Sequence, residues 1–236
     1  MEGPGARILA ERLKPLVGAS ADFLFQGRSV RRKIDEVCVQ GKRIYIGTAD
    51  GYLSIFFGMY GSLKTESHGL EGVSLTIVSG DSRLAFRRCS IRWISKSAFQ
   101  NLYDQRIDVT SESFDSGLVL KFIESADPER LVCDVLLDQN IFAGSGNIIK
   151  NEALFRSGIS PRRKLESICY GEREKLISET RIFSLMFLDA IKSGIPVKSI
   201  TQIYRKNSCR YCGSKVKREK MGETNRLTFY CESCQL

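Results

Sequence analysis

Two Cys-x-x-Cys pairs near the C-terminal end of the printed sequence constrain the fold of this chain more than any other feature. They are Cys209-Arg-Tyr-Cys212 and Cys231-Glu-Ser-Cys234, with eighteen residues between them. This spacing is typical of a structural zinc site in which four thiolates bind the metal and each pair occupies its own tight turn. Such a site leaves no open coordination position, so the predicted Zn²⁺ stabilises the fold and is not catalytic. Two redox dithiols or disulfides are the alternative interpretations.

The segment between the two pairs is basic and predicts a β-hairpin. Arg218, Lys220 and Arg226 supply cations there, and Leu227 and Phe229 supply the apolar positions of a strand. A metal-stabilised basic hairpin favours contact with nucleic acid, although a solvated basic surface is the simpler alternative.

The charge of the whole chain agrees with a polyanionic partner. The 236 residues include 36 Lys and Arg against 27 Asp and Glu, which gives a net charge of +9. Nucleic acid is the first candidate for such a partner and a membrane surface is the second. The single histidine, His68, excludes catalytic sites that need two or more histidines.

No part of the sequence predicts a membrane span or a secretory signal. No apolar run approaches the roughly eighteen residues of a membrane span, and the start of the chain does not resemble a secretory signal. We therefore expect an intracellular, reducing compartment, where cysteines are thiols or metal ligands. The cysteines outside the two pairs are expected to be small apolar side chains; they are Cys38, Cys89, Cys133 and Cys169.

The apolar spacing divides the chain into a strand-rich part and a helical part. A helical pattern begins near Pro4, and short alternating runs from about Phe23 to Phe122 predict an antiparallel sandwich or barrel. The pattern breaks at residues 124–128, and helical spacing follows. The predicted fold class is α+β, with domains at 1–123, 129–200 and 204–236.

The helical part contains a glycine-rich turn between two predicted helices. The turn is Phe142-Ala-Gly-Ser-Gly-Asn147, and the second helix runs from Ile148 to about Arg156. Glycines beside a helix start let backbone N–H groups approach a phosphate, which the helix dipole also favours. Taken alone the turn is weak evidence, because helical hairpins also carry Gly-x-Gly for turn geometry. A longer amphipathic helix is predicted from Glu172 to Lys192.

Five motifs stand in an order that a known family shares. They are Met1-Glu-Gly-Pro4, Gly41-Lys42, Gly58-Met-Tyr-Gly-Ser-Leu63, Gly146-Asn-Ile-Ile-Lys-Asn-Glu-Ala-Leu-Phe155 and Asn225-Arg-Leu-Thr-Phe-Tyr-Cys-Glu-Ser-Cys-Gln235. This arrangement resembles the family of formamidopyrimidine-DNA glycosylase and endonuclease VIII. The last two motifs look most like its third vertebrate endonuclease VIII-like (Nei-like) branch. The resemblance implies an N-terminal β-sandwich with an N-terminal helix, a helix–two-turn–helix domain and a C-terminal zinc-finger β-hairpin.

The resemblance also implies that Met1, Glu2 and Lys42 are catalytic. An α-amine has a pKa near 7.7–8, against about 10.4 for lysine, so far more of it is neutral and nucleophilic at pH 7. In the family this amine attacks C1′ of the damaged nucleotide, expels the base and leaves a Schiff base. Glu2 would then move protons to the sugar oxygen, and Lys42 would hold a phosphate or donate a proton. As a pattern alone, Glu2 also suits an acid at a helix N-terminus.

The chain departs from the family pattern at two places. Met1 stands where the family has proline, and the imine of a primary amine can lose the proton that keeps a proline Schiff base cationic. We therefore expect strand cleavage to be weaker than base excision. The segment Phe86-Arg-Arg-Cys-Ser-Ile-Arg92 lacks the usual Arg-Arg-Phe-Gly form, which predicts weak support of the opposite strand and a preference for single-stranded DNA.

Further residues are assigned to DNA binding by the same resemblance. Met59 occupies the loop position that wedges into the base stack and offsets part of the unstacking cost. Asn147 and Arg226 match positions that contact the phosphates beside the lesion. Lys150 and Tyr204 lie close to them in sequence and are weaker candidates.

These patterns together predict a DNA repair enzyme. We expect a DNA glycosylase with AP lyase activity that excises oxidised pyrimidines and hydantoins from damaged DNA, single-stranded or duplex. It would be a monomer with one structural Zn²⁺ and would work in the nucleus or wherever the host genome is repaired. The alternatives are a non-catalytic zinc-finger DNA-binding protein and a glycosylase with little lyase activity.

Overall fold

The computed structural model describes residues 1–58, 60–65 and 71–236, and these form two compact units. The first, here called the sheet unit, contains Met1 and Gly5–Asp104. The second, the helical unit, contains Glu2–Pro4 and Gln105–Leu236. The domain limits expected from the sequence remain a prediction. Met59 and His68 lie outside the described residues.

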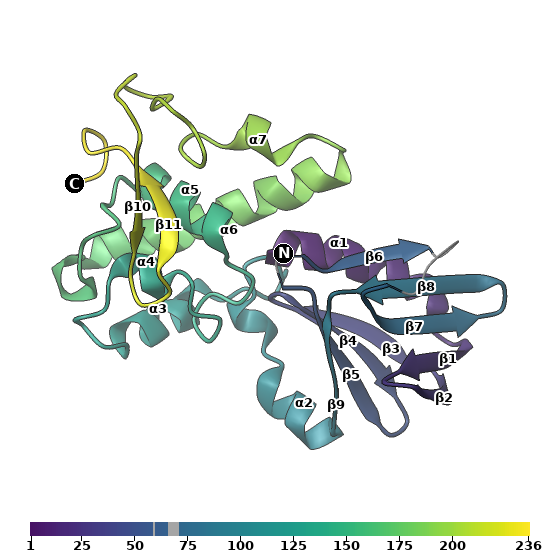
Figure 1. Cartoon of the computed structure of the whole chain (residues 1–236). Helices are drawn as coiled ribbons and strands as arrows, with labels where there is room; N and C mark the ends of the chain where they lie inside the picture. Colours follow the sequence, from purple (N-terminus) through teal and green to yellow (C-terminus); the bar gives the residue numbers. More distant parts are fainter. Residues whose placement is uncertain (59, 66–70) are drawn as a thin grey trace. The chain divides into compact units, whose positions relative to one another are not determined.

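Two antiparallel sheets and two α-helices, one before and one after the strands, make up the sheet unit (Figure 1). Helix α1 covers Gly3–Leu13, and a 3-10 turn at Lys14–Leu16 ends it, because Pro15 lacks the N–H that a continuing α-helix needs. One sheet has the order β2-β1-β7-β8-β6 and the other β3-β4-β5-β9. The strands are β1 (Ser20–Phe25), β2 (Arg28–Lys33), β3 (Glu36–Gln40), β4 (Arg43–Thr48), β5 (Gly51–Phe56), β6 (Ser62–Thr65), β7 (Val73–Ser79), β8 (Ser82–Arg87) and β9 (Ser90–Ile94).

Side chains from both sheets meet in one apolar core. Ile44 and Ile55, which pair across β4 and β5, are fully buried, and so is Phe86 of the other sheet. Burying a side chain of this size contributes about 1.5–3 kcal/mol relative to leaving it exposed. The shared core confirms the predicted β-sandwich.

The strand-rich part is shorter than the sequence predicted. Strands were expected to continue to about Phe122, but β9 is the last strand of the sandwich. Helix α2 (Lys96–Leu102) follows it, and helix α3 occupies Ser116–Glu124. The Asp115 carboxylate accepts a hydrogen bond of 3.0 Å from the Leu118 N–H at the start of α3. This N-terminal cap favours a helix at these residues.

The remaining helices belong to the helical unit, as predicted for the residues after Pro128. They are α4 (Val132–Val135), α5 (Asn147–Ser157), α6 (Tyr170–Lys192) and α7 (Val197–Ile200). Helix α6 begins with a capping box, in which the Glu172 carboxylate accepts a hydrogen bond of 2.9 Å from the Cys169 N–H. No helix in the described part of the chain is both long and apolar enough to cross a bilayer.

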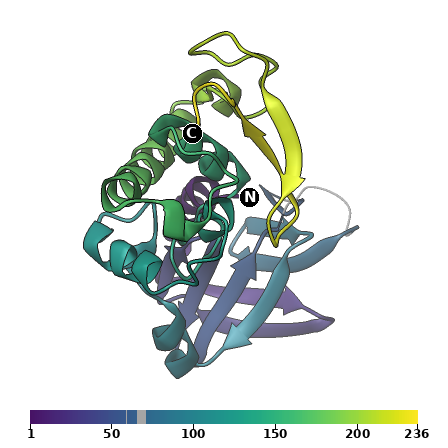
Figure 2. The same ribbon diagram turned by 90° about the vertical axis from the view of Figure 1, so that its left-hand side faces the viewer.

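The C-terminal segment is the predicted hairpin. Strand β10 (Lys217–Met221) pairs with β11 (Arg226–Tyr230), and Met221 lies opposite Arg226 beside the turn. Figures 1 and 2 show the hairpin in yellow beside the helices of the same unit, where β11 contacts α5. We call residues 204–236 the finger. The observed elements confirm the predicted fold class.

Candidate nucleic-acid interface and metal centre

The four cysteines of the two pairs lie together in the finger. Their sulfur atoms all lie within 4.8 Å of one another. The Cys209 and Cys234 sulfurs are 3.9 Å apart, and those of Cys212 and Cys231 are 3.5 Å apart. A tetrahedral zinc ion with Zn–S bonds of about 2.3 Å requires sulfurs about 3.8 Å apart, whereas a disulfide requires about 2.05 Å. The arrangement therefore fits a bound metal ion, and no disulfide joins these cysteines.

Glu2 caps helix α5 from a distant part of the sequence. The N-cap position of α5 is Gly146, which has no side chain to accept a hydrogen bond. The Glu2 carboxylate accepts instead, at 2.7 Å from the Ile148 nitrogen and 3.2 Å from the Ile149 nitrogen. Free N–H groups and the helix dipole both stabilise a negative charge at this end of a helix. Glu2 is therefore an acid at a helix N-terminus, as its pattern alone suggested, and the same carboxylate is the one expected to be catalytic.

Two glycines make room for this approach. A β-carbon at Gly146 would lie 2.5 Å from Cδ of Glu2, and one at Gly3 would lie 2.8 Å from Cα of Gly144. The Gly3 N–H also donates a hydrogen bond of 2.9 Å to the Gly144 carbonyl. The glycine-rich turn therefore has a specific use, which is to let the first residues of the chain reach the start of α5.

The other two residues predicted to be catalytic belong to the sheet unit. The Met1 amine donates a hydrogen bond to the carbonyl of Gly58, and the Met1 side chain packs against the sheet core. Lys42 lies in the two-residue turn between β3 and β4, where Gly41 has a φ of +57°. Tight hairpin turns favour glycine at such a position, because the left-handed region strains other residues. Lys42 is half-buried.

Asn147 and Arg226, the two residues expected to contact phosphates, come together in the helical unit. Asn147 is the first residue of α5, and its Nδ2 donates a hydrogen bond of 2.9 Å to the carbonyl of Leu227. Arg226 is the residue before Leu227 and begins β11 with an exposed side chain. The Asn147 side chain thus contacts the residue next to Arg226, and the guanidinium of Arg226 is a group that suits a phosphate.

Lys150 was expected near DNA, but only 1% of it is exposed. Its ammonium donates a hydrogen bond of 2.7 Å to the Thr228 hydroxyl of β11. Burial lowers the pKa of Lys150 to about 8, and the nearby Cys133 and Asp134 partly oppose this shift. Its neighbour Asn151 accepts a hydrogen bond of 2.6 Å from the Phe229 N–H.

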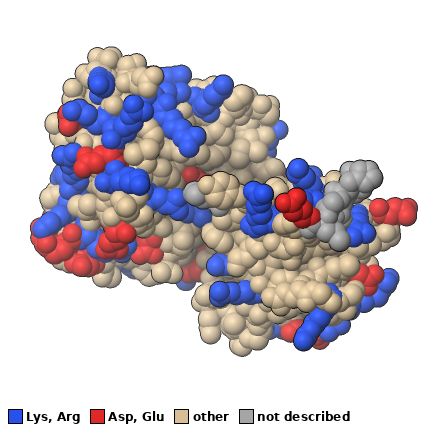
Figure 3. Space-filling view, viewed as in Figure 1, with Lys and Arg blue, Asp and Glu red and all other residues tan. Residues whose placement is uncertain are grey.

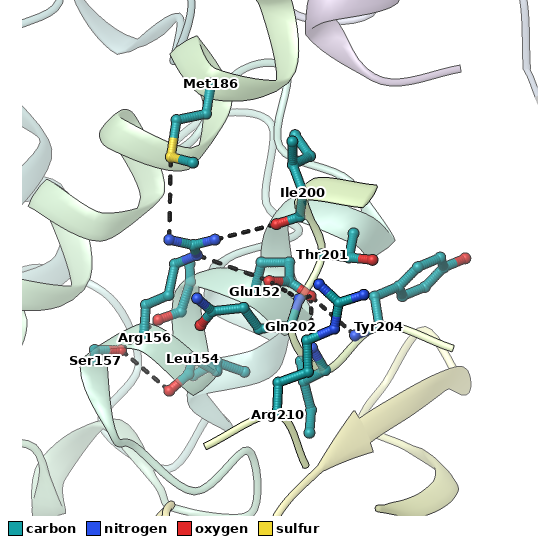
Figure 4. A network of polar contacts seen from close by, with 12 residues as sticks. Glu152, Leu154, Arg156, Ser157, Met186, Ile200, Thr201, Gln202, Tyr204 and Arg210 are labelled. Carbon is teal, nitrogen blue, oxygen red and sulfur yellow. Dashed lines mark hydrogen bonds and ion pairs between the residues drawn. The ribbon is translucent and has the colours of Figure 1, made fainter. Parts of the chain in front are cut away.

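Tyr204 lies where the helical part joins the finger (Figure 4). Its N–H donates a hydrogen bond of 2.9 Å to the carboxylate of Glu152, which is fully buried. The N–H groups of Gln202 and Ile203 donate to the same carboxylate. The Tyr204 ring packs edge-on against Phe229 at 5.2 Å. These contacts attach the start of the finger to α5.

Cations gather on the finger. Figure 3 shows Lys and Arg side chains crowded over the part of the surface where Figure 1 draws the hairpin. Two of the neighbouring acids are paired, Glu219 with Arg162 at 2.5 Å and Glu232 with Lys217 at 3.3 Å. The exposed cations of the finger are Arg205, Arg210, Lys215, Lys217, Arg218, Lys220 and Arg226.

Sequence reasoning missed four polar residues that hold the finger. Asp134, Asn151, Glu152 and Thr228 are all buried and all hydrogen-bonded across the unit. The run Lys150-Asn-Glu152, which stands between the apolar runs Ile148-Ile149 and Ala153-Leu-Phe155 of α5, was the available clue. Three adjacent polar residues of a helix cannot all face solvent beside a packed core, so one of them at least needs a buried partner.

Comparisons with known proteins agree with this description. A family model, the formamidopyrimidine-DNA glycosylase H2TH domain, matches residues 106–198. Endonuclease 8-like 3 of Mus musculus is 31% identical over 202 residues, which cover 83% of this chain and 33% of that protein. Endonuclease 8-like 2 of Homo sapiens is 34% identical over 205 residues, which cover 80% of this chain and 59% of that protein. The chain thus spans about a third to three fifths of the length of these relatives.

Solved structures share the fold at lower sequence identity. A viral DNA glycosylase matches with a TM-score of 0.86 and 23% identity, and the match covers 100% of both chains. The formamidopyrimidine DNA glycosylase of Lactococcus lactis, bound to DNA containing an AP site, matches with a TM-score of 0.85 and 19% identity. That match covers 100% of this chain and 99% of the other.

The fold and the site together define a class of protein, namely a β-sandwich followed by a helix–two-turn–helix domain and a four-cysteine finger. The family model and the relatives narrow this class. The chain belongs to the family of formamidopyrimidine-DNA glycosylase and endonuclease VIII, with endonuclease 8-like 3 among its similar relatives.

Proposed function

We propose that this chain is a DNA glycosylase with AP lyase activity that acts in DNA repair. The observation that carries the proposal is the Glu2 carboxylate at the N-terminus of α5, bonded to the Ile148 and Ile149 N–H groups. Glu2 follows Met1 in the sequence, and its carboxylate is bonded to the two residues that follow Asn147 in α5. A carboxylate beside a primary amine, next to a phosphate-binding helix end, suits attack of the amine on a sugar.

In the proposed reaction Met1 is the nucleophile, Glu2 transfers protons and Lys42 acts on a phosphate or as a proton donor. The Met1 ammonium loses a proton to Glu2 and the free amine attacks C1′ of the damaged nucleotide; the base leaves with the electron pair of its bond to C1′ and takes up the proton that the attacking nitrogen releases. Glu2 then delivers the proton to the sugar ring oxygen as the ring opens and an imine forms. Removal of a C2′ proton and departure of the 3′-phosphate complete the lyase step. Lys42 holds a phosphate or donates a proton during ring opening.

The nature of the amine sets the balance between the two activities. Met1 is a primary amine, so its imine can lose a proton and then withdraw electrons poorly from the sugar. We therefore propose that base excision exceeds strand cleavage. The opposite strand receives weak support, because the segment at residues 86–92 lacks the family pattern, and we propose that single-stranded DNA is favoured. Oxidised pyrimidines and hydantoins are the proposed bases, and the active form is a monomer.

DNA binding is assigned to the helical unit and to one residue outside the described part. Asn147 and Arg226 contact the phosphates beside the lesion, and Tyr204 lies at the start of the basic finger. Met59 enters the base stack. The four finger cysteines hold one Zn²⁺, which has a purely structural role because four thiolates fill its coordination sphere.

Borohydride trapping tests the proposal. The protein is mixed with an oligonucleotide that carries an abasic site or an oxidised pyrimidine, and borohydride reduces any imine to a stable amine bond. We expect a covalent adduct that peptide mass spectrometry places at the Met1 amine. Glu2→Gln should lower the rate of adduct formation at least about a hundredfold, the low end for loss of a general acid–base group. Glu11→Gln, at an exposed position of α1, is the matched control.

The alternatives give different results in the same experiment. Base excision without an adduct would indicate a glycosylase with little lyase activity. DNA binding with neither excision nor adduct would indicate a non-catalytic DNA-binding protein. Running the assay on single-stranded and duplex forms of one oligonucleotide tests the strand preference, and faster excision from the duplex would contradict it.

A further inference from the structure

Helix α5 and strand β11 are joined by three side-chain hydrogen bonds in a fixed order. Asn147, Lys150 and Asn151 of α5 bond to the Leu227 carbonyl, the Thr228 hydroxyl and the Phe229 N–H respectively. Residues three and four apart lie on one face of a helix, so the three side chains form a row. This row meets three consecutive residues of the strand. A shift of β11 by one residue would break all three bonds.

The turn of the hairpin is held separately. The Glu223 N–H donates a hydrogen bond of 3.0 Å to the Asp134 carboxylate of α4. Gly222, with a φ of +74°, packs so closely on Asp134 that a β-carbon would overlap the carboxylate. The hairpin is therefore fixed at its turn and along β11, with Arg226 between the two attachments.

Burying a charged lysine to make one of these attachments costs free energy of desolvation. An ammonium that is 1% exposed loses nearly all its hydration, whereas an apolar side chain of similar size would pack there without that cost. Its charged and titratable neighbours are Cys133 and Asp134 from α4, Glu2 before α1 and Arg226 from β11. Its ammonium donates a hydrogen bond to the neutral Thr228 hydroxyl.

We propose that Lys150 is a positioning residue. Together with Asn151 and Asp134 it clamps the hairpin on the helical unit in one register, and through that clamp it places Arg226 at a DNA phosphate without touching the DNA itself. This inference rests on the proposed function, because it assumes the phosphate contact of Arg226. It also changes the role expected for Lys150 from a DNA contact to a support for another residue.

A double-mutant cycle tests the inference. The Kd for a single-stranded oligonucleotide with a tetrahydrofuran abasic analogue is measured by fluorescence anisotropy at several salt concentrations. Arg226→Ala should weaken binding roughly tenfold and reduce the salt slope by about one, as expected for one phosphate contact. Lys150→Met should weaken binding to a similar degree on its own. In the Arg226→Ala background it should change the Kd less than about twofold, because coupled residues are not additive.

A direct phosphate contact by Lys150 gives the opposite pattern. The losses would then add, and Lys150→Met would reduce the salt slope by about one even without Arg226. That result would overturn the inference. Lys175→Met, at an exposed position of α6, removes the same charge and should leave the Kd within about twofold.

Hydrogen exchange reports on the clamp without DNA. Peptides covering residues 222–230 should exchange faster in Lys150→Met and in Thr228→Val, which breaks the same bond from the strand side. Zinc content, measured per chain, should stay at one in both variants if they remain folded. Unchanged exchange in both variants would overturn the clamp. A wild-type protein that binds no damaged DNA would instead overturn the proposed function, and the exchange data would then decide on the clamp alone.

Discussion

The missing β-carbon of Gly146 leaves room for the Glu2 carboxylate at the start of α5. A β-carbon there would lie 2.5 Å from Cδ of Glu2, so an alanine would push the carboxylate away from the start of α5. Gly171 in α6 is the matched case without a neighbour, since a β-carbon there would have nothing within 4 Å. Both glycines lie at the start of a helix, so together they separate the effect of this approach from the effect of adding a methyl group near a helix start.

We expect Gly146→Ala to reduce the rate of base excision at least about tenfold, because Glu2 can no longer accept both N–H groups. Gly171→Ala should leave that rate unchanged and raise the free energy of unfolding by less than about 0.5 kcal/mol, because Gly171 lies in the first turn of α6 and not in the helix interior. Single-turnover excision and urea unfolding measure the two effects. Wild-type excision by Gly146→Ala would contradict the role assigned to Glu2.

The buried ammonium of Lys150 should make stability depend on pH. Its pKa of about 8 lies below the ordinary value of 10.5. Between these values the unfolded chain binds the proton and the folded chain does not, so the free energy of unfolding rises with pH in this window. Relative to Lys150→Met, the wild type should gain roughly 3 kcal/mol from pH 8 to pH 10.5. Urea unfolding of both proteins at several pH values checks this, and parallel curves would refute it.

At the scale of elements, helix α5 supplies the acceptor that attaches the segment leading into the finger. One carboxylate of α5, that of Glu152, accepts hydrogen bonds of 2.9–3.0 Å from the consecutive N–H groups of Gln202, Ile203 and Tyr204. Arg156, one turn later, lies 3.7 Å from the same carboxylate and donates to the Ile200 carbonyl (Figure 4). The segment that leads into the finger is thus held by its backbone N–H groups. The pattern of its side chains therefore does not predict this attachment.

Glu152→Gln tests this attachment. An amide keeps the shape of the side chain but presents fewer acceptor sites to three donors, so we expect the free energy of unfolding to fall by about 1–3 kcal/mol. The finger cysteines should also react faster with a thiol reagent. Glu112→Gln, at an exposed position, should change stability by less than about 0.5 kcal/mol. Equal effects of the two substitutions would argue against the attachment.

At the scale of the whole molecule, the two units should respond differently to loss of metal. The finger has only a small apolar cluster of its own, formed with Phe155 and Ile203, whereas the sheet unit has a large core. The single tryptophan, Trp93, lies in β9 of the sheet unit and so reports on that unit alone. Metal ions that hold small domains contribute directly to their folding.

We therefore expect a chelator to remove one Zn²⁺ per chain, to abolish DNA binding and to expose residues 222–230 to hydrogen exchange. Trp93 fluorescence should not change. Cys212→Ser should reproduce these losses without a chelator, whereas Cys89→Ser should keep one Zn²⁺ per chain. Loss of the Trp93 signal together with the metal would contradict independent behaviour of the sheet unit.

Local sequence patterns predicted most of the elements correctly. They failed where a short run is compatible with both a helix and a strand, or where the partner of a residue is distant in sequence. The spacing of the cysteines, the long helix α6 and the glycine-rich turn were all found, because each depends on residues near one another in sequence. The strand-rich part was expected to extend to about Phe122, because apolar spacing over so few residues fits both strands and helices, and the structure has helices α2 and α3 there instead. Lys150 was expected near DNA because it lies close to Asn147 in sequence, and its buried partner Thr228 is 78 residues away, where no local pattern shows it.

The sequence by itself determined the four-cysteine centre, the helical and strand periods and the family to which the chain belongs. These follow from spacing and from residue type, which act over a few residues. Only the tertiary structure decided that Glu2 caps a helix 146 residues away, that Lys150 reaches Thr228 and that Glu152 holds the backbone of the finger. Each of these is a bond between distant segments, and its partner is chosen by packing, which no local pattern encodes.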